Sequence, residues 1–168
     1  MDLRCRNWYR TDPSRCGHHR PCGRTAGDAH RDDGRSPVVE RKRALADTSI
    51  FIGLEAERFD AGRFADYEWG VSVVTLGELR LGVLQARDPD TSARRLSTYQ
   101  LAERFEPIAI DEPVSDAWAL LVSRLRAAGR KAPISDSWIA ATAIAHNVPV
   151  VTQDADYDEM PGVEVIKL

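Results

Sequence analysis

Four carboxylates in this chain occupy positions from which they could form a single reactive site. They are separated by 31, 58 and 18 residues, and they are Asp47, Glu78, Asp136 and Asp154. Each acid taken alone has a structural explanation, because aspartates cap helices and start turns and glutamates are often simply solvated. Asp47 and Asp154 follow expected strands, Glu78 lies one turn into the helix after the second strand, and Asp136 opens a helix. All four can therefore converge on one edge of the sheet, which favours a shared site.

A site made only of carboxylates predicts metal chemistry. Carboxylates that lie close together repel, and each raises the pKa of the others unless a cation is present. Hard oxygen ligands without histidine or cysteine suit Mg²⁺ or Mn²⁺ better than zinc. One or two such ions can activate a water and stabilise the leaving oxygen of a phosphodiester, so the expected reaction is phosphodiester hydrolysis.

The pattern of apolar residues predicts the elements that would position these acids. We expect short apolar strands at residues 43–47, 69–73, 107–110, 148–151 and 163–166. We expect helices at residues 50–54, 61–67, 75–85, 92–103, 113–128 and 135–145. Strands that alternate with helices indicate a mostly parallel sheet, and strands that are apolar throughout indicate helices on both of its faces. Ligands of such sheets bind at the carboxyl ends of the strands, where Asp47 and Asp154 are expected.

The composition divides the 168 residues into two unlike parts. Residues 1–43 carry 11 Lys and Arg against six Asp and Glu, a net charge of +5, whereas residues 44–168 carry 12 against 20, a net charge of −8. The first part has few apolar side chains and cannot bury enough surface to offset its chain entropy, so we expect a disordered, Arg-rich leader. A basic nucleic-acid-binding arm, a metal knuckle around Cys16 and Cys22, and a start codon placed too far upstream remain open.

Several classes of protein are excluded. No apolar run approaches the ~18 residues of a membrane span, and no apolar core follows the N-terminal arginines as it would in a secretory signal. No cysteine follows Cys22, so residues 44–168 contain no disulfide framework, which fits a reducing compartment. We therefore expect a cytoplasmic protein with no membrane partner.

Four segments in order resemble the motifs of PIN-domain ribonucleases, and most closely those of the VapC toxins of bacterial toxin–antitoxin pairs. They are ADTS at 46–49, TLGELRLG at 75–82, ISDSWIAA at 134–141 and TQDADY at 152–157. The resemblance covers residues 44–168. It implies a three-layer α/β/α fold with a mainly parallel sheet of about five strands and metal-dependent endoribonuclease activity on RNA. It also implies a homodimer that is inhibited by a cognate VapB-like antitoxin.

The resemblance also implies roles for individual residues. The acidic site would consist of Asp47, Glu78, Asp136 and Asp154. Among these, Asp47 and Asp136 would be the surest metal ligands, and Asp156 could add another. Thr48 and Thr152 would orient the ligands through hydrogen bonds. The chain departs from the family in having forty-odd extra residues before Asp47, the aspartate of the first motif, which favours the upstream-start explanation or else an added arm of unknown use.

Two other functions remain open. One is a catalytically inactive PIN-like module that binds RNA or protein, although none of the four acids is missing. The other is a metal-dependent phosphatase on an α/β fold, but the haloacid-dehalogenase type needs a second aspartate where this chain has Ser49. The net charge of −8 argues against RNA binding, yet the four site carboxylates account for half of it.

Overall fold

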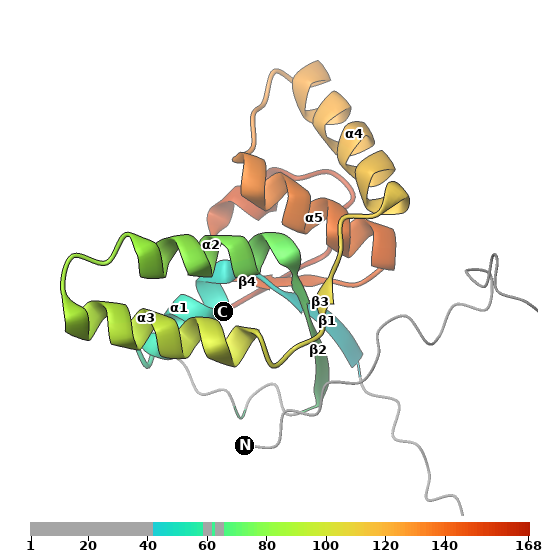
Figure 1. The fold of residues 1–168 in the computed structure, drawn as a ribbon. Coiled ribbons are helices and arrows are strands. Elements are labelled where there is room, and N and C mark those ends of the chain that lie inside the picture. The colour runs from blue at the N-terminus through green and yellow to red at the C-terminus, as the bar shows by residue number, and fades with distance from the viewer. Residues whose placement is uncertain (1–41, 59–61, 63–65) are drawn as a thin grey trace, which may run out of the picture.

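The computed structural model describes residues 42–58, 62 and 66–168. Within them, five parallel strands form one sheet in the order β3-β2-β1-β4-β5 (Figure 1). The strands are β1 Lys42–Ala46, β2 Tyr67–Ser72, β3 Pro107–Ile108, β4 Val150–Thr152 and β5 Val165–Lys167. The prediction of a parallel sheet of about five strands is confirmed.

The connections between the strands are helical. The helices are α1 Thr48–Glu55, α2 Val73–Leu84, α3 Pro89–Ala102, α4 Glu112–Ala127 and α5 Ile134–His146, with a short 3-10 helix, η4, at Ala155–Glu159. The first four begin after a side chain that accepts a first-turn backbone N–H, which satisfies one of the free donors at a helix start. These caps are Asp47, Ser72, Asp88 and Asp111. In the part of the chain that is described, no helix is long and apolar enough to cross a membrane.

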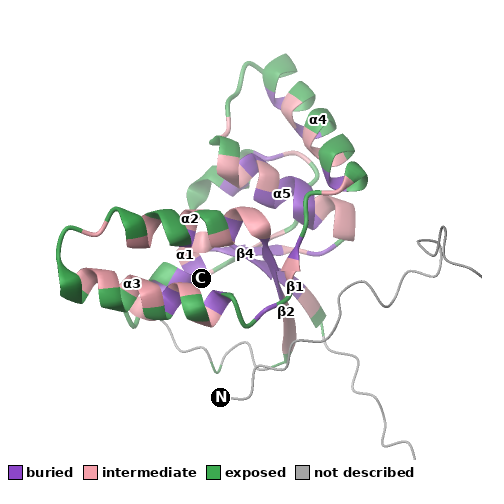
Figure 2. Cartoon of the chain, in the orientation of Figure 1, coloured by how far each residue is buried: buried purple, intermediate pink, exposed green. Residues whose placement is uncertain are grey.

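Both faces of the sheet are covered, as the uniformly apolar strands predict. In β1 the side chain of Leu45 packs in one core with residues of α4 and α5, such as Leu121 and Ile139. Its neighbours Ala44 and Ala46 belong to a second core that includes residues of α1, α2 and α3. Successive residues of a strand point to opposite faces, so this division gives three layers. Figure 2 shows the buried residues concentrated on the strands and on the sides of the helices that face them.

Some expectations differ from the structure in their boundaries. The helix expected at 61–67 lies largely outside the described residues, and its last residue, Tyr67, is instead the first residue of β2. Helix α2 begins two residues earlier than expected because Ser72 accepts the N–H of Val74 at 3.3 Å and so ends the strand. The 3-10 helix η4 was not predicted.

The Arg-rich leader, with its cysteines, lies outside the described residues up to residue 41. Lys42 and Arg43, which the sequence analysis assigned to it, belong to β1 and pair with Tyr67 and Glu68 of β2.

The strand order reverses direction beside β1. The chain passes from β1 to β2 and β3 on one side, and then to β4 and β5 on the other. Open parallel sheets bind their ligands at the carboxyl ends of the strands where the order reverses. Asp47 follows β1 directly, and Asp154 lies two residues after the end of β4. The topology therefore brings two of the predicted acids to the same edge.

Candidate metal centre and active site

Asp47 is almost completely buried at the end of β1, with 4% of its surface exposed. Its Oδ2 accepts hydrogen bonds from the hydroxyls of Ser49 at 2.7 Å and Thr152 at 2.8 Å. Its Oδ1 accepts a third from the hydroxyl of Tyr157 at 2.9 Å. Burying a carboxylate is costly unless hydrogen bonds replace its water. These bonds compensate that cost, and they join the end of β1 to β4 and η4.

Tyr157 is a site residue that the sequence analysis missed. It is buried in η4, and burial together with the charge of Asp47 raises the pKa of Tyr157 above its usual value. The phenol therefore keeps its proton and remains a donor to Asp47. Ser49, the other missed residue, also accepts the backbone N–H of Gln153 at 2.9 Å. Both residues lie inside the motifs quoted above, but the bonds from Gln153 to Ser49 and from Tyr157 to Asp47 each span more than 100 positions.

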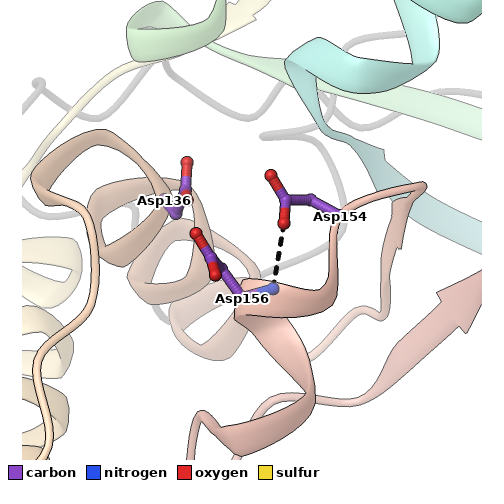
Figure 3. Close-up of side chains that lie close together, drawn as sticks. All are labelled: Asp136, Asp154 and Asp156. Atoms are coloured by element: carbon purple, nitrogen blue, oxygen red, sulfur yellow. Dashed lines mark hydrogen bonds between the residues drawn. The ribbon is translucent and has the colours of Figure 1, made fainter.

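A cluster of three carboxylates lies beside this buried aspartate. Each of Asp136, Asp154 and Asp156 offers an oxygen, and these oxygens lie within 4.8 Å of one another. Asp136 comes from the first turn of α5, and the other two come from the segment after β4 (Figure 3). Asp154 also accepts the backbone N–H of Asp156 at 3.0 Å, which starts η4. Carboxylate oxygens are the hard donors that a divalent cation of the Mg²⁺ type prefers, so the residue types of this cluster suit such an ion.

The other predicted acids lie close enough to Asp136 for their charges to act on it. Burial, and then the charges of Asp47, Glu78, Asp154 and Asp156, raise the pKa of Asp136 to about 7. All the predicted carboxylates are thus close enough to affect the same proton. A cation among them would relieve their repulsion and favour the charged form of Asp136.

Glu78 reaches the site from α2 and is partly buried. The hydroxyl of Thr48 donates to its Oε2 at 2.5 Å. The two threonines expected to orient the acids therefore each bond to one of them, Thr48 to Glu78 and Thr152 to Asp47. Asp47, expected as a metal ligand beside Asp136, is not in the group of three, and three hydroxyls bind its carboxylate.

Comparisons with known proteins all indicate the same family. The profile described as "PIN domain" matches residues 44–163. Ribonuclease VapC4 of Mycobacterium tuberculosis is 72% identical over 127 residues, which cover 76% of this chain and 98% of that protein. Ribonuclease VapC5 of the same bacterium is 40% identical over 128 residues, which cover 74% of this chain and 94% of that protein.

Solved structures give the same result. The crystal structure of VapBC-5, a toxin–antitoxin system of M. tuberculosis, matches with a TM-score of 0.68 and 37% identity, covering 75% of this chain and 98% of that one. A VapBC2 structure from Rickettsia felis, bound to a DNA fragment of its promoter, has a TM-score of 0.65 and 20% identity over 75% of this chain and 98% of that one. At that identity the second match shows a shared fold.

Proposed function

Because this chain belongs to the PIN-domain family and to its VapC ribonucleases, we propose that it is an endoribonuclease that acts as the toxin of a toxin–antitoxin pair. The observation that carries the proposal is the convergence of five carboxylates at the carboxyl ends of β1 and β4. The nuclease domain would begin at Lys42, the first residue of β1, two residues before the boundary expected from the sequence, and it would act in the cytoplasm. The residues before Lys42 would be a separate leader.

The cofactor that we propose is Mg²⁺ or Mn²⁺. Asp136, Asp154 and Asp156 would hold it, with Asp47 as a further ligand, because their oxygens are hard donors and the raised pKa of Asp136 indicates unbalanced negative charge. When bound, such an ion lowers the pKa of water and offsets the charge that develops on a phosphodiester. The hydroxyls on Asp47 would keep its carboxylate in one orientation.

Glu78 is the residue that we propose as the proton acceptor. The hydroxyl of Thr48 holds its Oε2, so its Oε1 would take the proton of the attacking water. Proton transfer by a positioned carboxylate typically contributes 10²–10⁴-fold, about the loss expected when it is removed. Glu78→Gln keeps the shape of the side chain and should therefore lower kcat with little change in fold.

A VapB-like antitoxin is the protein partner that we propose, together with a second copy of the chain. The related VapBC-5 structure is of a toxin–antitoxin system. In this chain α1 and α2 expose the large apolar side chains Ile52, Leu81 and Leu84. Coverage of these side chains by a partner would remove apolar surface from water.

The decisive experiment compares two aspartate variants on RNA. Purified full-length chain is incubated with total cellular RNA in Mg²⁺, in Mn²⁺ and in EDTA, and the cleavage ends are mapped. We expect metal-dependent cuts that Asp136→Asn reduces by about 10²-fold or more. The matched control is Asp116→Asn, an exposed acid on α4, which should cleave like the unaltered chain.

Three results would contradict the proposed function. Equal cleavage by both variants would move the reaction to another site. RNA that is bound but left intact in every metal would indicate a binding module. Hydrolysis of a small phosphomonoester without cleavage of RNA would indicate a phosphatase.

A further inference from the structure

A cavity of about 130 Å³ adjoins the acidic cluster. Arg130, Lys131 and Ala132, which follow α4, form one side of it, and Asp156 and Glu159 of η4 form another. A single water needs about 10–15 Å³ of such space, so the cavity can take a larger group. Asp156 is both a member of the acidic cluster and part of the cavity lining. A ligand in the cavity would therefore lie next to a metal ion or phosphodiester bound at the acidic cluster.

The segment that carries the two cations is fixed by its backbone. Helix α4 ends at Ala127, and Gly129, two residues later, has a φ of +69° in the left-handed region. The N–H of Arg130 then reaches back to the carbonyl of Leu125 at 2.8 Å. This arrangement closes the helix end as a Schellman-type cap does. Arg130 and Lys131 are thus presented from a closed turn and not from an open loop.

The charged side chains that line the cavity sum to a net charge of zero, and a bound metal ion would make that sum positive. Its lining carries two cations, Arg130 and Lys131, and two carboxylates, Asp156 and Glu159. The Nε of Arg130 lies 3.5 Å from Oε2 of Glu159, and their side chains are 49% and 67% exposed. Exposed pairs of this kind contribute little, so an incoming phosphate can replace the glutamate. A cation on Asp156 would leave the cavity with a net positive charge.

We propose that this cavity binds the RNA nucleotide next to the one that is cut, with its phosphate on Arg130 and Lys131. This inference rests on the RNA-cleaving function proposed above. A phosphodiester held at the cluster places the neighbouring phosphate of the same strand towards the cavity, because Asp156 borders both. Arginine is suited to such a contact, since its guanidinium offers paired donors to phosphate oxygens. Glu159 competes with the RNA for Arg130.

The test measures binding of RNA by the full chain. Every variant also carries Glu78→Gln to suppress cleavage, and the probe is a fluorescein-labelled RNA 12-mer of random sequence in Mg²⁺. Fluorescence anisotropy gives the Kd at several salt concentrations. Loss of one phosphate contact should lower the slope of log K against log salt by about 0.7. We expect this decrease for Arg130→Gln and for Lys131→Gln, with binding weakened about fivefold at low salt.

The ion pair between Arg130 and Glu159 offers a variant that should strengthen RNA binding instead of weakening it. Glu159→Gln frees Arg130 from its partner and should tighten binding of the same probe. If Arg130 served only to hold Glu159, its loss and the loss of Glu159 would change stability alike and leave the salt slope unchanged. The matched control is Arg87→Gln, an exposed arginine in the turn between α2 and α3. Figure 1 shows this turn well apart from the segment that joins α4 to α5. Its slope should equal that of the Glu78→Gln parent.

RNA cleavage by the same variants without Glu78→Gln distinguishes an error in the proposed role of the cavity from an error in the proposed function. We expect Arg130→Gln and Lys131→Gln to raise KM and largely preserve kcat. Salt slopes and KM values equal to those of the controls, together with metal-dependent cleavage by the unaltered chain, would overturn the cavity alone. A chain that cleaves no RNA in any divalent metal would overturn both.

Discussion

At the scale of single residues, Asp47 and Asp136 show two ways of placing a carboxylate in one site. Three hydroxyls bind Asp47, so its charge is compensated by the protein itself. Asp136 instead faces four other acids, and its pKa is raised to about 7. Asp47 can therefore serve as a fixed support, and Asp136 is the group whose charge depends most on a cation.

This contrast predicts how stability changes with pH in the absence of metal. The pKa of Asp136 rises from 3.8 to about 7 on folding, so between these values the native state holds its proton more tightly than the unfolded state does. The contribution of Asp136 to stability is then greatest near pH 4 and falls until about pH 7, above which it is constant. Urea unfolding in EDTA at pH 5 and pH 7.5 measures this. Asp136→Asn should remove the decrease, and an identical decrease in that variant would contradict the assignment.

A second prediction concerns the support of Asp47. Tyr157→Phe deletes the hydroxyl that donates to Oδ1 and leaves a buried carboxylate oxygen without that bond, at a cost of about 1–3 kcal/mol in the free energy of unfolding. Tyr99→Phe is the control, because Tyr99 is a half-buried residue of α3 whose hydroxyl interacts with the exposed Glu103. Its loss should change stability much less, since water can replace an exposed partner. In the Asp47→Asn background the effect of Tyr157→Phe should shrink, because the two groups interact. Additive effects would show that the bond is unimportant.

At the scale of elements, local sequence patterns identify most helices and strands but not their partners. Pro113 and Gly129 indicate the ends of α4, and the short apolar runs indicate the strands. The helix η4 was missed because five residues are too few to show a helical period. The bond from Tyr157 to Asp47 spans 110 positions, and no local pattern records such a distance. The sequence therefore predicts which acids converge and, through the family resemblance, the roles of Thr48 and Thr152, but it does not indicate Ser49 and Tyr157 as donors to Asp47.

Alanine substitutions at two glycines, Gly129 beyond the end of α4 and Gly77 within α2, should change stability in opposite directions. Gly129 has a φ of +69°, which an alanine adopts only with strain, although no atom lies within 4 Å of the added Cβ. Gly129→Ala should therefore destabilise the protein by about 1 kcal/mol. Gly77 lies within α2, and its Cβ would also meet nothing within 4 Å. Gly77→Ala should stabilise by about 0.5–1 kcal/mol, and urea denaturation of both variants measures the difference.

Gly129 also connects helix α4 to the residues that line the cavity. Gly129 precedes the two cations, so a strained turn there should also displace Arg130 and Lys131. Gly129→Ala is thus expected to weaken RNA binding as well as stability, whereas Gly77→Ala should leave binding unchanged. Loss of stability with unaltered RNA affinity would show that the turn supports the helix end and not the cations.

At the scale of the whole molecule, several of the acidic residues that make the chain negative are gathered in one place. Residues 44–168 carry a net charge of −8, and five of their carboxylates converge at one edge of the sheet. The repulsion among these five is concentrated at one place, so simple salt should relieve it less than a bound divalent ion does. The average charge of the chain is therefore a poor guide to whether it binds RNA.

The final prediction follows from this concentration of charge. The proposed Mg²⁺ would bind the native state, in which the acids are assembled, so it should raise the Tm, by an amount equivalent to about 2.7 kcal/mol at a concentration one hundred times the Kd. Protons compete for Asp136, whose pKa is about 7, so the gain should be larger at pH 8 than at pH 5.5. NaCl at matched ionic strength is the control for general screening. Asp136→Asn should greatly reduce the gain and its dependence on pH. An equal rise of Tm in NaCl, or an undiminished rise in that variant, would place the binding of Mg²⁺ outside the acidic cluster.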